Sequence, residues 1–176
     1  MKKTGKITVC AMMVALASAL MLTSYFPYLT YAIPAVAGLF IMVAVIETDV
    51  KWATVSYIAS AIIVFIMAEP EAKMLYVLFF GYYPIVKSLS ERLKSRITEY
   101  LLKFLVFNAS IIVAYLLMWV LLGISIDEMG EFGKYTAIVM LVAGNIIFPI
   151  YDIAVAQVAR FYIARVHPAV AKIFKF

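Results

Sequence analysis

The sequence predicts an all-α polytopic membrane protein, one transmembrane domain over residues 1–176 built as a six-transmembrane-helix bundle with both termini cytoplasmic. Hydrophobic residues make up 66% of the chain and charged residues 14%, against about 45–50% and about 25% in soluble domains. Several apolar runs reach the roughly 20 residues that cross a bilayer core as helix. Basic residues also fall on one side of these runs. Together these observations exclude a soluble enzyme, a disordered chain and a nucleic-acid-binding module.

The N-terminal region predicts two helices. Residues 7–46 contain no Asp, Glu, Lys or Arg, which is too long a run for one span and suits two. A tyrosine-rich segment with two prolines, 24–34, marks the break, so helices are expected at about 6–25 and 33–47. A cleaved signal peptide is the alternative for residues 1–19, because lysines precede the apolar run. The run continues past that point, which favours a membrane helix.

The rest of the chain predicts four more helices, separated by short polar or glycine-containing segments. They are expected at about 52–68, 72–90, 100–126 and 135–160. Gly81 and Pro84 predict a local irregularity in the second of these helices, and Pro149 interrupts the last one.

The distribution of basic residues predicts the orientation. With the N-terminus inside, thirteen of the 15 Lys and Arg residues lie on the inner side, and only Lys73 and Lys134 lie outside. Cytoplasmic loops carry such an excess of Lys and Arg. The protein is therefore expected in a bacterial plasma membrane with both termini in the cytoplasm.

The scarcity of reactive residues limits the chemistry. Cys10 is the single cysteine and His167 the single histidine, so an internal disulfide, a zinc or iron–sulfur site and a Ser–His–acid triad are not expected. The phosphate-binding motif G-x-x-x-x-G-K-[ST] is absent from the sequence. The sequence thus predicts no enzyme activity, no bound metal and no cofactor, and any energy must come from a partner or an ion gradient.

Polar residues inside the predicted spans are candidate functional or structural groups. They are Asn108, Asn145 and Asp152. An Asp at mid-bilayer costs about 2.5–3.5 kcal/mol on insertion scales, so it should face the bundle interior and find a partner. Asn108 lies at a similar predicted depth, and a hydrogen bond between it and Asp152 is the favoured interpretation. A proton or cation relay and contact with a substrate are the alternatives.

Aromatic residues concentrate near the predicted outer ends of the helices. An interfacial belt explains many of them. However, Tyr76, Phe80 and Tyr83 follow helical spacing and would line one stripe able to stack on a flat heterocycle. Tyr28 and Tyr31 belong to the first predicted outer loop.

The first predicted helix carries small residues at every fourth position. Ala11, Ala15 and Ala19 share one face of this helix. Small residues at this spacing let helix backbones approach closely in lipid. The face would either pack inside the bundle or dock another membrane protein.

The architecture, this alanine face and the basic, proline-containing segment 160–168 resemble the S component, the substrate-binding membrane subunit of energy-coupling factor (ECF) transporters. The resemblance implies six helices with both termini inside, and docking of Ala11, Ala15 and Ala19 to a transmembrane T component that works with two cytoplasmic ATPase subunits. It also implies that the loop at 24–34 closes over a solute held near the outer surface. The substrate-binding residues expected on this basis are Tyr28, Tyr31, Tyr76, Phe80, Tyr83 and Asn145.

The favoured function is therefore capture of a small, micronutrient-like solute, as in vitamin uptake, for an ECF-type importer. No signature of a particular vitamin subfamily is present. The alternative is a six-span structural or scaffold protein of a bacterial envelope complex, which would use the same small-residue face for permanent partners. A membrane enzyme is disfavoured, because Asp152 is the single Asp predicted inside a span and no paired acid or His accompanies it.

Overall fold

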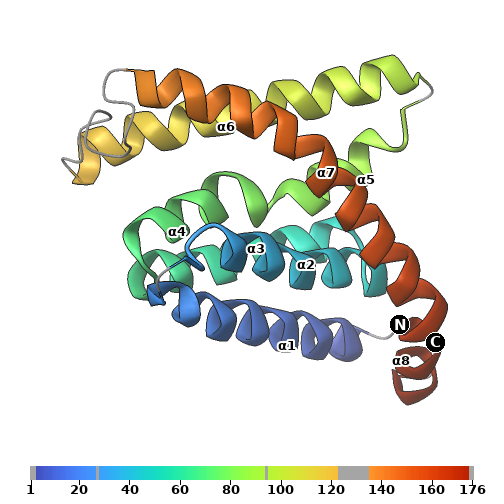
Figure 1. The fold of residues 1–176 in the computed structure, drawn as a ribbon. Coiled ribbons are helices and arrows are strands. Elements are labelled where there is room, and N and C mark those ends of the chain that lie inside the picture. Colours follow the sequence, from blue (N-terminus) through green and yellow to red (C-terminus); the bar gives the residue numbers. More distant parts are fainter. Residues whose placement is uncertain (1–2, 27, 94, 123–134, 175–176) are drawn as a thin grey trace.

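A computed structural model describes residues 3–26, 28–93, 95–122 and 135–174, and all regular elements in these ranges are helices. The elements are α1 (Lys3–Met21), the 3-10 helix η1 (Leu22–Tyr25), α2 (Ala32–Glu47), α3 (Val50–Met67), α4 (Pro70–Leu75), the π-helical segment η2 (Tyr76–Phe80), α5 (Tyr83–Ser90), α6 (Arg96–Leu122), α7 (Thr136–Arg165) and α8 (His167–Phe174) (Figure 1). The acidic loop expected at 127–134 and the end of the helix expected at 100–126 lie outside the described residues.

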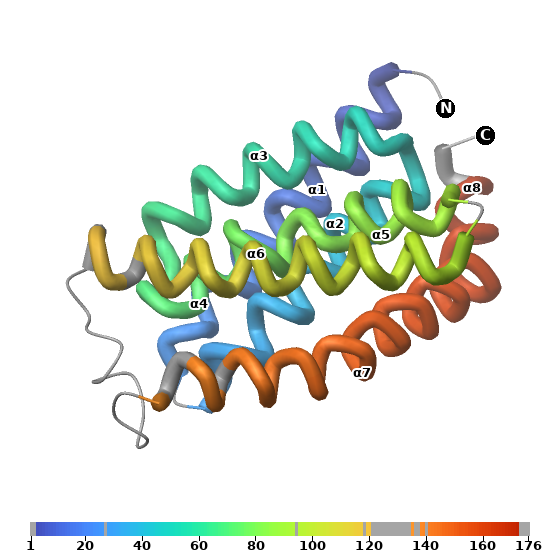
Figure 2. The backbone as a smooth tube through the Cα atoms, turned by 90° about the horizontal axis from the view of Figure 1, so that it is seen from above, coloured from blue at the N-terminus to red at the C-terminus, as the bar shows by residue number. Residues whose placement is uncertain are grey.

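The helices form a bundle in which α4, η2 and α5 lie between two groups. On one side α1 packs against α2 and α3, and on the other α6 packs against α7. The middle segment η2 contacts α2, α3 and α6. Both chain termini lie at the same end of the bundle (Figures 1 and 2). We call this the terminus end, and the opposite end, where α2 begins, the loop end.

Four helical segments in the described ranges are long and apolar enough to cross a membrane. They are Lys3–Tyr25, Val50–Met67, Arg96–Leu117 and Leu141–Arg165. Their outward faces carry large exposed apolar side chains such as Ile66 and Ile97, which water would solvate poorly and lipid would solvate well. Helix α2 is also apolar, but its 16 residues span only about 24 Å at 1.5 Å per residue.

The helix expected at 72–90 is broken into α4, η2 and α5, which confirms the irregularity predicted from Gly81 and Pro84. The Gly81 amide donates to the carbonyl of Tyr76 at 2.8 Å, an i→i+5 bond that defines the π turn. The hydroxyl of Tyr57 donates to the carbonyl of Val77 at 2.5 Å. A side chain from α3 thus supports the widened turn.

Gly38 lets α2 approach this π segment. A Cβ atom at Gly38 would lie 2.3 Å from the backbone oxygen of Phe80 and 3.4 Å from the hydroxyl of Tyr151. No larger residue fits there unless the backbone moves. The close contact between α2 and η2 therefore depends on this glycine.

Two polar contacts close the terminus end. Asp49 caps α3 by accepting from the amide of Trp52 at 3.1 Å, and Lys6 of α1 donates to its other oxygen at 2.6 Å. The hydrogen bond from Lys6 lowers the pKa of Asp49 below its usual value. Glu47, the buried last residue of α2, lies 3.0 Å from the Nδ1 atom of His167 in α8. These contacts tie α1 to α3 and the C-terminal helix to α2.

Candidate functional site

An apolar cavity of about 570 Å³ lies toward the loop end, between α2, η2, α6 and α7. Its volume falls within the range of roughly 300–1,000 Å³ typical of small-molecule sites. We call it the aromatic cavity; its lining residues are Tyr31, Ala32, Ala35, Leu75, Phe79, Phe80, Phe107, Ile111, Tyr115, Ala143, Gly144, Ile147, Phe148 and Tyr151. None of these described lining residues carries a charged side chain.

Ring-to-ring contacts hold the wall of the aromatic cavity in place. Phe107 and Phe148 stack with ring centroids 4.7 Å apart, joining α6 to α7. Phe79 meets Phe107 edge-to-face at 5.2 Å, and Phe80 meets Tyr151 in the same manner at 5.0 Å. Such aromatic pairs contribute about 0.5–1.5 kcal/mol each beyond the area they bury. The wall is therefore preformed before a ligand arrives.

Small residues leave the space that the rings do not fill. Ala32 and Ala35 of α2 face Ala143 and Gly144 of α7 across the cavity. A Cβ atom at Gly144 would lie 2.9 Å from the ring carbon Cζ of Phe107. Glycine at this position thus lets Phe107 lie against α7 and complete the wall.

Polar groups gather at the rim of the aromatic cavity. The Tyr31 side chain lies beside Glu71 of α4, and both groups lie within electrostatic reach of Tyr115 of α6. Glu71 is partly buried, hydrogen-bonds with Tyr31 and lies within electrostatic reach of Glu69. Burial and Glu71 together raise the pKa of Tyr31. Glu71 has no cationic partner within the part of the chain that the structure describes.

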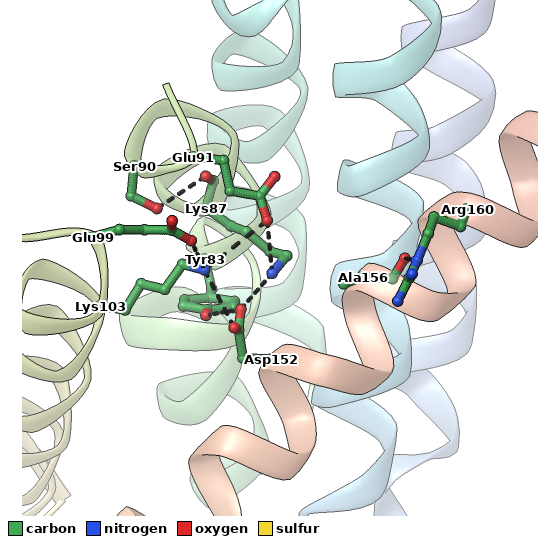
Figure 3. A network of polar contacts seen from close by, with 9 residues as sticks. All are labelled: Tyr83, Lys87, Ser90, Glu91, Glu99, Lys103, Asp152, Ala156 and Arg160. Atoms are coloured by element: carbon green, nitrogen blue, oxygen red, sulfur yellow. Dashed lines mark hydrogen bonds and ion pairs between the residues drawn. The ribbon is translucent and has the colours of Figure 1, made fainter. Parts of the chain in front are cut away.

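A second polar site, the ion cluster, lies nearer the terminus end and comprises Lys87, Glu91, Glu99, Lys103 and Asp152 (Figure 3). Lys87 donates to Asp152 at 2.5 Å and pairs with Glu91 at 2.9 Å. Lys103 donates to Glu99 at 2.6 Å and to the other oxygen of Asp152 at 3.2 Å. One carboxylate from α7 thus joins a lysine from α5 to a lysine from α6.

All three central groups of the ion cluster are buried. The exposed fractions are 6% for Lys87, 2% for Lys103 and 6% for Asp152. Charges at this depth persist only when they are paired and hydrogen-bonded, because desolvation costs several kcal/mol per ion. Here every one of these charges has at least two hydrogen-bonded or ionic partners. The charges of the ion cluster are therefore all paired, and together they link α5, α6 and α7.

Tyr83 connects the two sites. Its hydroxyl donates to Asp152 at 2.6 Å, and its ring lies 4.9 Å from the ring of Phe79 in the cavity wall. The aromatic cavity and the ion cluster therefore share a wall, although Tyr83 itself does not line the cavity.

The structure separates the residues expected to bind substrate. Tyr31 and Phe80 line the aromatic cavity, whereas Tyr28 is 98% exposed, with a positive φ of 70°. Tyr76 is buried among other apolar residues and its hydroxyl pairs with Ser60 at 2.8 Å. Of the stripe expected from helical spacing, Tyr76, Phe80 and Tyr83, the cavity lining therefore includes Phe80 alone.

The prediction of a hydrogen bond between Asn108 and Asp152 is wrong. Asn108 instead pairs with Asn145 through two reciprocal amide bonds, at 2.9 and 2.8 Å. Asp152 takes the two lysines as partners. Helix periodicity places Asn145 and Asp152 on similar faces, but the sequence gives no depth for the lysines that reach them.

Sequence reasoning missed most of the cavity wall and both cluster lysines. Phe107, Ile111 and Tyr115 recur every fourth residue on α6, and this spacing was a usable signal for one lining face. Gly144, Phe148 and Tyr151 recur at spacings of four and three residues on α7, which also places them on one face. The sequence does not show that these two helix faces meet, so the spacing alone predicts ordinary helix packing.

The alanine face of α1 points away from the bundle. Ala11, Ala15 and Ala19 are exposed, whereas the buried face of this helix contains Met13 and Ala17. The alternative that the alanines pack inside the bundle is therefore wrong for this chain.

Comparisons with known proteins return no relatives. No family model matches the chain, no curated protein matches it, and no solved structure matches it. Among the described residues, no group of three or more His, Cys, Asp or Glu side chains is placed to hold a metal ion. The site must therefore be interpreted from its own geometry.

Proposed function

We propose that this chain is the solute-binding membrane subunit of an ECF-type importer. The observation that carries the proposal is the aromatic cavity, a preformed space of about 570 Å³ at the loop end. A site of this size with an apolar and aromatic lining is typical of a small-molecule pocket. A purely structural scaffold has no need for such a space, because packing would fill it.

The membrane topology in this proposal has six spans. The four long apolar helices supply four of them, and α2 and the broken segment α4–η2–α5 supply the other two. Both shorter segments pack against other helices, so their irregular backbone is shielded from lipid. In this proposal the terminus end lies in the cytoplasm and the aromatic cavity lies toward the outer surface of a bacterial plasma membrane, which the distribution of Lys and Arg supports.

The exposed alanine face supplies the docking surface in this proposal. Ala11, Ala15 and Ala19 leave a smooth strip on α1 that a helix of the T component would approach closely. Two cytoplasmic ATPases then supply energy through that partner. The solute enters the aromatic cavity from outside and leaves when the assembled complex changes shape.

The test of docking is co-purification with a co-expressed T component and its two ATPases. Ala15→Leu places a large side chain in the alanine face and should abolish co-purification. Ala154→Leu is the matched control, because Ala154 is also exposed but lies on α7. Normal co-purification of the Ala15 variant, or equal loss in both variants, would remove the docking claim.

A scaffold protein of a bacterial envelope complex is the second candidate, since an exposed small-residue strip also suits a permanent partner. Native mass spectrometry of the detergent-purified chain separates the two. A co-purifying small molecule of defined mass supports the solute-binding subunit. No bound molecule, together with no thermal shift across a panel of metabolites, supports the scaffold.

A further inference from the structure

The polar groups around the aromatic cavity have an asymmetric distribution. Inside, the polar side-chain atoms are tyrosine hydroxyls, and that of Tyr151 already lies 3.5 Å from the backbone oxygen of Ala35. A charged group deep in this space would lack a partner and would lose several kcal/mol of solvation. Any charge on the ligand must therefore lie at the rim.

The rim carries a carboxylate that forms no salt bridge with a cation of the described residues. Glu71 is partly buried beside Tyr31 and lacks a cationic partner among the described residues. The nearest cation in sequence, Lys73, lies 5.4 Å over the ring of Phe65. The second acid, Glu69, uses its carboxylate to cap α4 by accepting from the amide of Ala72 at 2.8 Å. Glu71 is thus the acid available to a ligand.

The two tyrosines at the rim join this carboxylate to the cavity. Tyr31 and Tyr115 both line the aromatic cavity and both interact with Glu71. An ammonium group here would find one carboxylate and two tyrosine hydroxyls that can accept hydrogen bonds, whereas an anion would meet Glu71 and Glu69.

We propose that the aromatic cavity takes an organic cation, with a ring-containing apolar body between the aromatic walls and one ammonium-type group at the rim beside Tyr31, Glu71 and Tyr115. This inference rests on the proposed role of the cavity as the solute site and adds the chemical class of the solute. The cavity supplies shape and stacking, and the rim supplies the selection by charge.

Three probes of matched shape test the proposal: 2-naphthylmethylammonium, 2-naphthylmethanol and 2-naphthoate. Each is titrated at pH 7 into the full chain in phosphatidylcholine nanodiscs, with naphthalene fluorescence anisotropy as the readout and empty nanodiscs as the background. The cation should bind at least about tenfold more tightly than the anion, a difference of ~1.4 kcal/mol. Glu71→Gln should remove most of this preference and leave binding of the neutral alcohol unchanged.

A pair of α7 variants locates the binding. Ala143→Phe fills the aromatic cavity and should abolish binding of all three probes, because Ala143 lines it. Ala154→Phe adds the same side chain on an exposed position of α7 and should leave binding intact. Circular dichroism and thermal unfolding of each variant separate a filled cavity from a misfolded chain.

The outcomes are distinct. Equal binding of the cation and the anion, tighter binding of the anion, or an unchanged preference in Glu71→Gln would overturn the cation class. Binding that survives Ala143→Phe, or a cavity that native mass spectrometry finds occupied by phospholipid, would overturn the ligand site. Co-purification with the T component is measured in a separate experiment. If the ligand class is wrong but the chain still co-purifies with the T component, the proposal that it is an importer subunit is retained.

Discussion

The aromatic cavity and the ion cluster share helices α6 and α7 but are built by opposite means. The described residues that line the cavity are uncharged, and stacked rings and small residues keep it open. The cluster packs buried charges whose partners are all in place, and it leaves α5, α6 and α7 tied to one another. The contrast indicates that the loop end of the bundle is shaped to bind a molecule, whereas the ion cluster fixes α5, α6 and α7 relative to one another.

The backbone follows the same division. The loop end contains the starts of α2 at Ala32 and of α4 at Pro70, and the irregular π segment η2 follows α4 toward the middle of the bundle. The terminus end has the Asp49 cap with Lys6, and the contact between Glu47 and His167. The loop end is joined by neutral hydrogen bonds, such as that from the Tyr25 hydroxyl to the Met67 carbonyl at 3.1 Å, whereas Lys6 and Asp49 pair as ions at the terminus end. Neutral hydrogen bonds are weaker than those between charged groups, so we expect opening for a solute at the loop end.

The largest expected effect comes from removing the central acid of the ion cluster. Asp152→Ala leaves Lys87 and Lys103 buried with one fewer carboxylate, and breaking such a buried pair costs about 3–5 kcal/mol. Unfolding in detergent, followed by circular dichroism, measures the change in free energy. Glu91→Gln is the control, because the Glu91 side chain is 48% exposed and should cost far less. An equal loss of unfolding free energy in both variants would contradict the conclusion that the buried ion cluster holds the three helices together.

The next effect concerns the backbone contact behind the aromatic cavity. Gly38→Ala sets a Cβ atom 2.3 Å from the Phe80 oxygen, so α2 and η2 must separate, at a cost of about 1–3 kcal/mol. Gly144→Ala is the matched control, since its Cβ meets the ring of Phe107 at 2.9 Å and a side chain moves more easily than a backbone. Thermal unfolding of the two variants gives the comparison. A larger loss of thermal stability in Gly144→Ala than in Gly38→Ala would contradict the conclusion that the contact between α2 and η2 is the tighter of the two.

A smaller effect is expected at the seam between α6 and α7. Asn108 and Asn145 exchange two amide hydrogen bonds, and interhelical bonds of this kind contribute about 0.6–2 kcal/mol in lipid. A double-mutant cycle with Asn108→Leu and Asn145→Leu should give a coupling free energy in this range. Strictly additive losses would show that the pair adds nothing beyond each side chain alone.

The smallest effect is pH dependence at the terminus end. The pKa of Asp49 is lowered, so the folded state favours the ionised carboxylate. The stabilisation is present above the ordinary carboxyl pKa of about 3.9 and is lost as the pH falls through the lower folded-state value. The pair with Lys6 is partly exposed, so the change should stay below about 1 kcal/mol and weaken in high salt.

Asp49→Asn tests this pH effect, because asparagine keeps an N-cap acceptor and removes the charge. Thermal unfolding at neutral and acidic pH should show a smaller acid-induced loss in the variant than in the wild type. The same loss in both would assign the acid sensitivity to other groups.

The sequence predicts the helices well and their partners poorly. The apolar runs place α2 and α3 within two residues, because length and hydropathy are local properties. Tyr31 and Phe80 are found at the cavity from aromatic content near the loop end. In contrast, the Asp152 partners depend on how far Lys87 and Lys103 reach into the bundle, and this follows from which helix faces meet. The cavity wall is missed for the same reason, since Phe107 and Phe148 belong to different helices.

The π segment η2 determines the rotation of α5 about its helix axis. One residue corresponds to about 100° of rotation in an α-helix. Shortening η2 by a single residue would therefore turn α5 by that angle and move Tyr83 and Lys87 away from Asp152. The same irregular turn also presents Phe79 and Phe80 to the cavity. A change of chain length at this point would disrupt both sites together, although no substitution had touched either one.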